Sequence, residues 1–130
     1  MFLGDPTSEQ RTLFAHMKNL QDLCIEAVRP GVTAASVDLA MRNYFEACDL
    51  WPLWRHHVGH GIGRRYHEAP FLDRGDDTML TPGMVLTVEP GVYHADWGGF
   101  RHSDTLVVTE SGSELLTDYP RDLDSLVIPT

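Results

Sequence analysis

Six of the seven histidines lie within residues 56–102, and this density is the first sign of a chemical site in the sequence. An imidazole titrates near neutral pH, at about 6.5, and binds metal ions through a neutral ring nitrogen. A solvated loop could carry such residues without any chemistry, but their concentration beside glycine-rich turns favours a site. The six are His56, His57, His60, His67, His94 and His102, whereas His16 lies in the first third of the chain.

Three short segments narrow the site further. Residues 59–63 read Gly-His-Gly-Ile-Gly, which places the imidazole of His60 among glycines that let the backbone approach a ligand closely. The alternative is a glycine-rich bulge with an incidental histidine. Residues 67–70 read His-Glu-Ala-Pro, and residues 87–91 read Thr-Val-Glu-Pro-Gly, so that Glu89 ends a strand directly before a turn. A lone carboxylate there would be a surface residue, but the three segments together indicate a site.

The first third of the sequence is predicted to form two helices that support this site, because apolar residues recur there at helical spacing. Thr7, with Gln10 three residues later, fits a capping box, and Arg29-Pro30-Gly31 ends the first helix. Thr33 is the expected N-cap of the second helix, which ends before Trp51-Pro52. The apolar helical residues are Leu13, Met17, Leu20, Cys24 and Ala27, then Val37, Ala40, Met41, Tyr44, Phe45 and Cys48.

From His56 onward, short β-branched or apolar runs alternate with glycine and proline, which is typical of strands joined by turns. Two helices followed by antiparallel strands predict an α+β domain with the helices on one face of the sheet. Strands are expected at 84–89, 105–109, 58–62 and 114–116, with turns at 81–83 and 111–112.

The composition is that of one globular domain. The 130 residues carry a net charge of −9, and 42% of them are apolar. The acidic balance argues against nucleic acid or an anionic membrane as a partner. No run approaches the roughly 18 apolar residues of a membrane span, and residues 1–6 show no secretory signal, so we expect a cytoplasmic protein. Cys24 and Cys48 are too few for a disulfide scaffold or a cysteine zinc site and are expected to be buried thiols.

Five segments resemble the pita-bread metallopeptidase family, which includes methionine aminopeptidase, Xaa-Pro aminopeptidase and prolidase, with creatinase as a metal-free relative. They are residues 60–63, 67–70, 82–84, 89–93 and 104–110. Tyr93, after Glu-Pro-Gly, and the Gly-Phe-Arg run ending at Arg101 resemble the proline-specific branch more than methionine aminopeptidase. The resemblance covers essentially the whole chain.

The resemblance implies a hydrolase that holds two divalent metal ions (Mn, Co or Zn) through one histidine and four carboxylates, with a bridging water as nucleophile. In this sequence His60 matches the histidine ligand, and Glu89 matches one carboxylate of the catalytic centre. His67 matches the histidine that stabilises the tetrahedral intermediate, and His56 matches a substrate-side histidine of the proline-specific branch. Arg101 matches an arginine beside the substrate carboxylate, a role that suits its planar fork.

Two departures from the family pattern weaken the implied metal site. The final glutamate ligand belongs two residues after Arg101, where this sequence has Ser103. Its neighbour Asp104 is expected to face the opposite side of the strand. The two aspartate ligands of the family precede the segment where this sequence begins, so the chain resembles the C-terminal part of the catalytic domain. Glu89 alone sets one negative charge against four positive, and we therefore predict that the chain lacks the paired metals.

Three functions stay open at this point. The first is peptidase activity of the Xaa-Pro aminopeptidase or dipeptidase type, releasing the N-terminal residue of a peptide and impaired in this chain by itself. The second is a metal-independent hydrolase of a small amide or guanidino substrate, similar to creatinase, with His67 as general acid–base. The third is a non-catalytic fragment whose glycines and prolines are inherited structure.

The expected architecture is half of a pita-bread fold, a single domain over residues 1–130 with two N-terminal helices on a curved antiparallel sheet. The other half would normally pair with these strands, and an uncovered edge favours association. We therefore expect a homodimer, or a partner chain that supplies the missing half-domain. The expected ligand is a peptide or a small amide.

Overall fold

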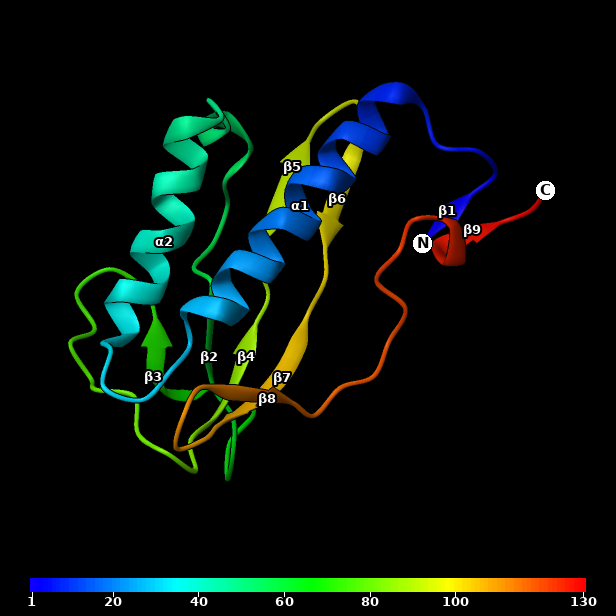
Figure 1. Cartoon of the computed structure of the whole chain (residues 1–130). Coiled ribbons are helices and arrows are strands. Elements are labelled where there is room, and N and C mark those ends of the chain that lie inside the picture. Colours follow the sequence, from blue (N-terminus) through cyan, green and yellow to red (C-terminus); the bar gives the residue numbers. More distant parts are fainter.

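Two helices form one layer of the molecule in the computed structural model, which describes all 130 residues (Figure 1). The first, α1, spans Ser8–Ala27, and the second, α2, spans Ala34–Ala47. Thr7 forms the predicted capping box, because its hydroxyl accepts from the Gln10 amide at 3.3 Å and its own amide donates to Gln10 Oε1 at 2.9 Å. Thr33 caps α2 through the Ser36 amide at 3.2 Å. The predicted helix starts are confirmed.

A five-stranded antiparallel sheet forms the second layer, and its strand order is β3-β2-β4-β7-β8. Both helices lie on one side of this sheet (Figure 1). The smaller elements are the antiparallel hairpin β5–β6, the parallel pair β1–β9 and two 3₁₀ turns. The strands are β1 Phe2–Leu3, β2 Gly59–Gly61, β3 Glu68–Leu72, β4 Val85–Val88, β5 Gly91–His94, β6 Gly98–Arg101, β7 Asp104–Val108, β8 Ser113–Leu115 and β9 Val127–Ile128; the turns are Trp51–Leu53 and Asp124–Leu126.

The core lies between the helices and the sheet. Along β7 every second residue is buried, and Leu86 of β4 pairs in register with Leu106 of β7. Both leucines belong to one apolar cluster with Leu20 and Cys24 of α1. This burial raises the pKa of the Cys24 thiol to about 12. The expected α+β fold is therefore confirmed. Of the two cysteines expected to be buried, Cys24 is buried and Cys48 is only half-buried.

Five of the nine strands were not predicted from the sequence, namely β1, β3, β5, β6 and β9. Proline and glycine weaken the strand signal in β3, which contains Pro70, and in the glycine-rich hairpin β5–β6. Their conformation depends instead on tertiary pairing, with β3 against β2 and β5 against β6. Strand β3 places the second histidine segment beside β2 of the five-stranded sheet, whereas β6 places Arg101 in the separate hairpin with β5.

The outer edge of β3 is protected within the chain. Pro70 has no amide to donate, and the Phe71 amide donates to the Asp76 carboxylate at 2.7 Å. Such features block the addition of another strand at this edge. Neither α1 nor α2 combines the length and the apolar character that a membrane span requires.

Candidate functional site

Strand β2 carries His60 between β3 and β4, and its glycines permit close packing against both strands. A Cβ on Gly59 would lie 1.9 Å from the Thr87 carbonyl oxygen of β4, and one on Gly61 would lie 2.5 Å from the Ala69 carbonyl oxygen. No larger residue fits at either position without moving a backbone. The glycines therefore permit close packing of β2 against its neighbouring strands, with a register shift between His60 and Gly61. Close approach of a ligand to residues 59–63 stays a prediction.

His60 is buried and its tautomer is fixed by hydrogen bonding. Nδ1 lies 2.9 Å from the Gly61 carbonyl oxygen, so Nδ1 carries the hydrogen. Nε2 then points to Glu89 Oε1 at 3.1 Å. A metal-binding histidine commonly has the same arrangement, with its other ring nitrogen donating to a carbonyl.

Glu89 is the centre of a polar cluster on the sheet face opposite the helices. Its Oε1 also accepts from the Thr87 hydroxyl at 3.3 Å, and its Oε2 accepts from the Ser103 hydroxyl at 3.2 Å. The Arg101 guanidinium lies 3.6 Å from the same Oε2. Both carboxylate oxygens are therefore partnered by groups of the protein itself.

Ser103 and Asp104 lie on opposite faces, as strand alternation predicts. Asp104 is buried toward α1, where its Oδ2 accepts from Gln21 Nε2 at 2.9 Å. It therefore does not take the place of the missing glutamate, and the only side chain that residues 103–104 offer Glu89 is the serine hydroxyl.

The two histidines predicted to lie on the substrate side, His56 and His67, lie near this cluster. His67 is exposed, and its ring centroid lies 4.0 Å from that of His60. His56 lies further along the sheet, where its Nε2 is 2.7 Å from the Tyr93 hydroxyl and its Nδ1 is 2.9 Å from the His57 carbonyl oxygen. Because Nδ1 faces a carbonyl, the tyrosine hydroxyl donates to Nε2.

Tyr93 is a site residue that sequence analysis treated only as a mark of the proline-specific branch. Its ring occupies the space above two glycines of the β5–β6 hairpin, since a Cβ on Gly91 or Gly99 would lie 2.7 or 2.6 Å from it. Burial raises the pKa of Tyr93, which keeps its hydroxyl protonated as a donor to His56. The sequence alone does not show that Gly99 lies opposite Tyr93, because this pairing follows from the register of the β5–β6 hairpin.

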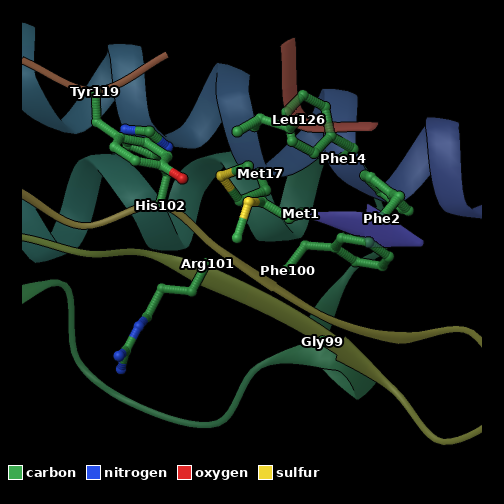
Figure 2. A pocket seen from close by; sticks show the side chains of 10 residues that line it. All are labelled: Met1, Phe2, Phe14, Met17, Gly99, Phe100, Arg101, His102, Tyr119 and Leu126. Atoms are coloured by element: carbon green, nitrogen blue, oxygen red, sulfur yellow. The ribbon is translucent and has the colours of Figure 1, made fainter. Parts of the chain in front are cut away.

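The other three histidines of residues 56–102 lie apart from this cluster or at its rim. His57 is half-buried, between His60 and Phe71. His94 stacks on Trp97 with ring centroids 3.8 Å apart. His102 is buried on the helix side, where it lines a pocket of about 230 Å³ that hydrophobic and polar residues share. Arg101 also lines this pocket, but Figure 2 shows its side chain extending away from the other lining residues, and its guanidinium lies 3.6 Å from Glu89 Oε2.

The buried His102 predicts that the fold loses stability in acid. Burial lowers the pKa of this imidazole below its ordinary value, against the opposing effect of Asp104. A histidine with a lowered pKa in the folded state contributes stability above its unfolded pKa and loses it as the pH falls through the folded value. We expect the melting temperature of wild type to fall from about pH 7.5 to about pH 5, and that of His102→Gln to fall less. Equal slopes in thermal melts of the two proteins would contradict this.

The family model for metallopeptidase family M24 matches residues 1–110. The chain belongs to this family. M24 relatives include a probable dipeptidase PepE from Mycobacterium tuberculosis, 37% identical over 98% of this chain, and a Xaa-Pro dipeptidase from Pyrococcus horikoshii, 36% identical over 93% of it. The chain spans about a third of the length of these relatives, 33% and 34% respectively.

Solved M24 structures share the fold. Dipeptidase PepE from Mycobacterium ulcerans superposes with a TM-score of 0.91 at 37% identity, covering 98% of this chain and 34% of that one. The X-Pro aminopeptidase from Thermotoga maritima has a TM-score of 0.88 at 29% identity, covering 98% and 35%. Methionine aminopeptidase from Rickettsia prowazekii has a lower score of 0.72 at 26% identity, covering 86% and 54%. The pita-bread expectation is therefore confirmed.

M24 is a metallopeptidase family, so the donors of this chain have to be compared with the needs of a metal ion. No group of three or more His, Cys, Asp or Glu side chains is placed to hold one. His60 and Glu89 are the two donors in contact, and Ser103 offers only a neutral hydroxyl beside them. Hard divalent cations are held by about six oxygen ligands. The residues of this chain do not by themselves fit a metal pair.

Proposed function

We propose that this chain forms the substrate-binding and imidazole part of a peptidase site of the Xaa-Pro dipeptidase type. One observation carries the proposal: His60 and Arg101, which lie 29 and 12 positions from Glu89 in the sequence, both contact its carboxylate. His67 lies beside His60, and His56 is bonded to Tyr93 of the β5–β6 hairpin. The Xaa-Pro names of the relatives support a substrate with proline after the first residue.

Each side chain has a chemical task in such a site. Arg101 is about half exposed and presents its planar fork beside Glu89, where it binds the carboxylate of a short peptide. His67, exposed beside the buried His60, donates a hydrogen bond to the oxygen of the scissile carbonyl as negative charge develops there. His56, oriented by Tyr93, lies on the substrate side. Glu89 accepts a proton or orients the attacking water.

The same residues limit what the chain does by itself. Glu89 supplies one negative charge, whereas a pair of divalent ions such as Mn, Co or Zn carries four. The fully partnered Glu89 is the observation that favours a second candidate, a metal-independent hydrolase of a small amide or guanidino substrate. His67 would then act as general acid–base. Association with a second copy or with a partner chain remains a prediction, which light scattering at micromolar concentration checks.

Binding of a Xaa-Pro dipeptide tests the first candidate without requiring turnover. We expect such a dipeptide to shift the ring signals of His56 and His67 in NMR spectra of the chain. Arg101→Met should weaken this binding about tenfold or more, because a charge-assisted hydrogen bond to the carboxylate is lost. Arg55→Met is the matched control, since Arg55 is exposed and bonds only to the nearby carbonyl oxygens of Pro52 and Trp54.

Hydrolysis assays with and without a chelator separate the two candidates. Turnover that survives the chelator and disappears in His67→Ala supports the metal-independent hydrolase. Turnover that requires added Mn²⁺ contradicts the expectation that the chain alone is impaired. Absence of dipeptide binding in wild type, or equal binding by Arg101→Met, overturns the proposed substrate class.

A further inference from the structure

A buried polar network lies beneath the Glu89 cluster, on the helix side of the sheet. Gln21 of α1 is 1% exposed, and its single side-chain nitrogen makes two hydrogen bonds. Nε2 donates to the Val88 carbonyl oxygen at 2.8 Å and to Asp104 Oδ2 at 2.9 Å. The amide oxygen Oε1 has no hydrogen-bond partner, so only the two bonds of Nε2 offset the cost of burying this amide in an apolar core.

Asp104 joins this amide to the C-terminal segment. The carboxylate is 2% exposed and also accepts from the Thr117 hydroxyl at 2.6 Å. The Arg121 guanidinium lies 3.2 Å from its Oδ2 and 3.4 Å from Asp22 of α1. One buried charge thus receives partners from α1 and from two points of the segment after β8. Removing one partner of such a buried charge is strongly destabilising.

The two groups that Gln21 bonds are register partners and the immediate neighbours of the site residues. Val88 pairs with Asp104 across β4 and β7. Glu89 follows Val88, Ser103 precedes Asp104, and the side chains of Glu89 and Ser103 meet on the opposite face at 3.2 Å. Gln21 therefore holds the two strands together at the point where the site side chains project.

We propose that Gln21, through Val88 and Asp104, is a positioning residue that holds the Glu89–Ser103 pair at its place against His60. It does not touch the site and acts from the other face of the sheet. The inference rests on the proposed function only for its relevance to catalysis. Its test measures the local structure at Glu89 and His60, so the result does not depend on whether the chain has activity.

Amide hydrogen exchange in Gln21→Leu tests the proposal. The Glu89 amide donates to the Val58 carbonyl oxygen at 2.7 Å, and the Val108 amide donates to the Met84 carbonyl oxygen at 2.9 Å. Loss of the Gln21 bonds should raise exchange at Glu89 relative to Val108 by about tenfold, since local opening becomes easier near the lost bonds. The ring ¹⁵N signals of His60 should shift as its contact with Glu89 changes.

Cys24→Ala is the matched control, because Cys24 lies on the buried face of the same helix. It should lower global stability while leaving the ratio of Glu89 to Val108 exchange and the His60 ring signals as in wild type. Asp104→Asn, which keeps the side-chain shape and weakens the bond from Gln21, should give a smaller change of the same kind and serves if Gln21→Leu does not fold. Equal ratios and His60 signals in the Gln21 or Asp104 variant and the control would overturn the proposal.

Discussion

Replacing Arg42 with leucine is expected to lower the free energy of unfolding by about 3–5 kcal/mol, because it leaves the buried Asp38 carboxylate without its cation. Arg42 pairs with Asp38 one turn earlier on α2, and Asp38 is 1% exposed. Arg42 also lies over the rings of Trp51 and Trp54, 5.8 and 5.2 Å from their centroids. Chemical denaturation of wild type and variant measures the loss.

The pH dependence of this loss identifies its origin. Burial raises the pKa of Asp38 above its ordinary value, so the folded state takes up this proton at a higher pH than the unfolded state does. The effect of Arg42→Leu should therefore shrink as the pH falls toward about 4, where Asp38 no longer needs a cation. The double variant Asp38→Asn/Arg42→Leu should recover much of the stability at neutral pH. A pH-independent loss with no recovery would assign the effect to packing against the tryptophans instead.

Ser103→Glu is expected to raise the affinity of the chain for Mn²⁺ at least tenfold, or about 1.4 kcal/mol. The new carboxylate would lie beside Glu89, where the serine hydroxyl now donates at 3.2 Å. A metal ion at His60 would then have two carboxylates beside it instead of one. Divalent cations gain affinity with the number of carboxylate ligands. Calorimetric titration with Mn²⁺ measures the change directly.

Ser103→Gln is the control for this prediction, because it has the size of glutamate without the charge. It should leave Mn²⁺ affinity at the wild-type value. If Ser103→Glu also leaves the affinity unchanged, the site is organised for chemistry without a metal ion. If wild type already binds two Mn²⁺ ions tightly, the prediction that the chain lacks the paired metals is wrong.

The parts of the fold that depend on local sequence were predictable. The caps at Thr7 and Thr33 use side chains and amides a few residues apart, so the helix starts follow from the sequence. The opposite orientations of Ser103 and Asp104 follow from strand alternation alone. Family resemblance brought His60 and Glu89 to one site, and the structure places them 3.1 Å apart.

The parts that depend on tertiary register were not predictable. Tyr93 becomes a partner of His56 only because the β5–β6 hairpin places Gly99 beneath its ring. Gln21 occupies an apolar helix face. Nothing in its sequence neighbourhood indicates that it bonds Val88 and Asp104, which lie 67 and 83 positions further along the chain. Such polar contacts between distant segments leave no periodic pattern in a single sequence.

The opposed side chains of residues 103 and 104 have a practical consequence for protein engineering. Ser103 lies on the sheet face that carries Glu89, whereas Asp104 belongs to the network that holds helix, sheet and C-terminal segment together. Position 103 can therefore be substituted without removing a residue of that network. Side chains of different acidity or nucleophilicity can be installed there one at a time and compared on an unchanged scaffold, with Asp104 left intact.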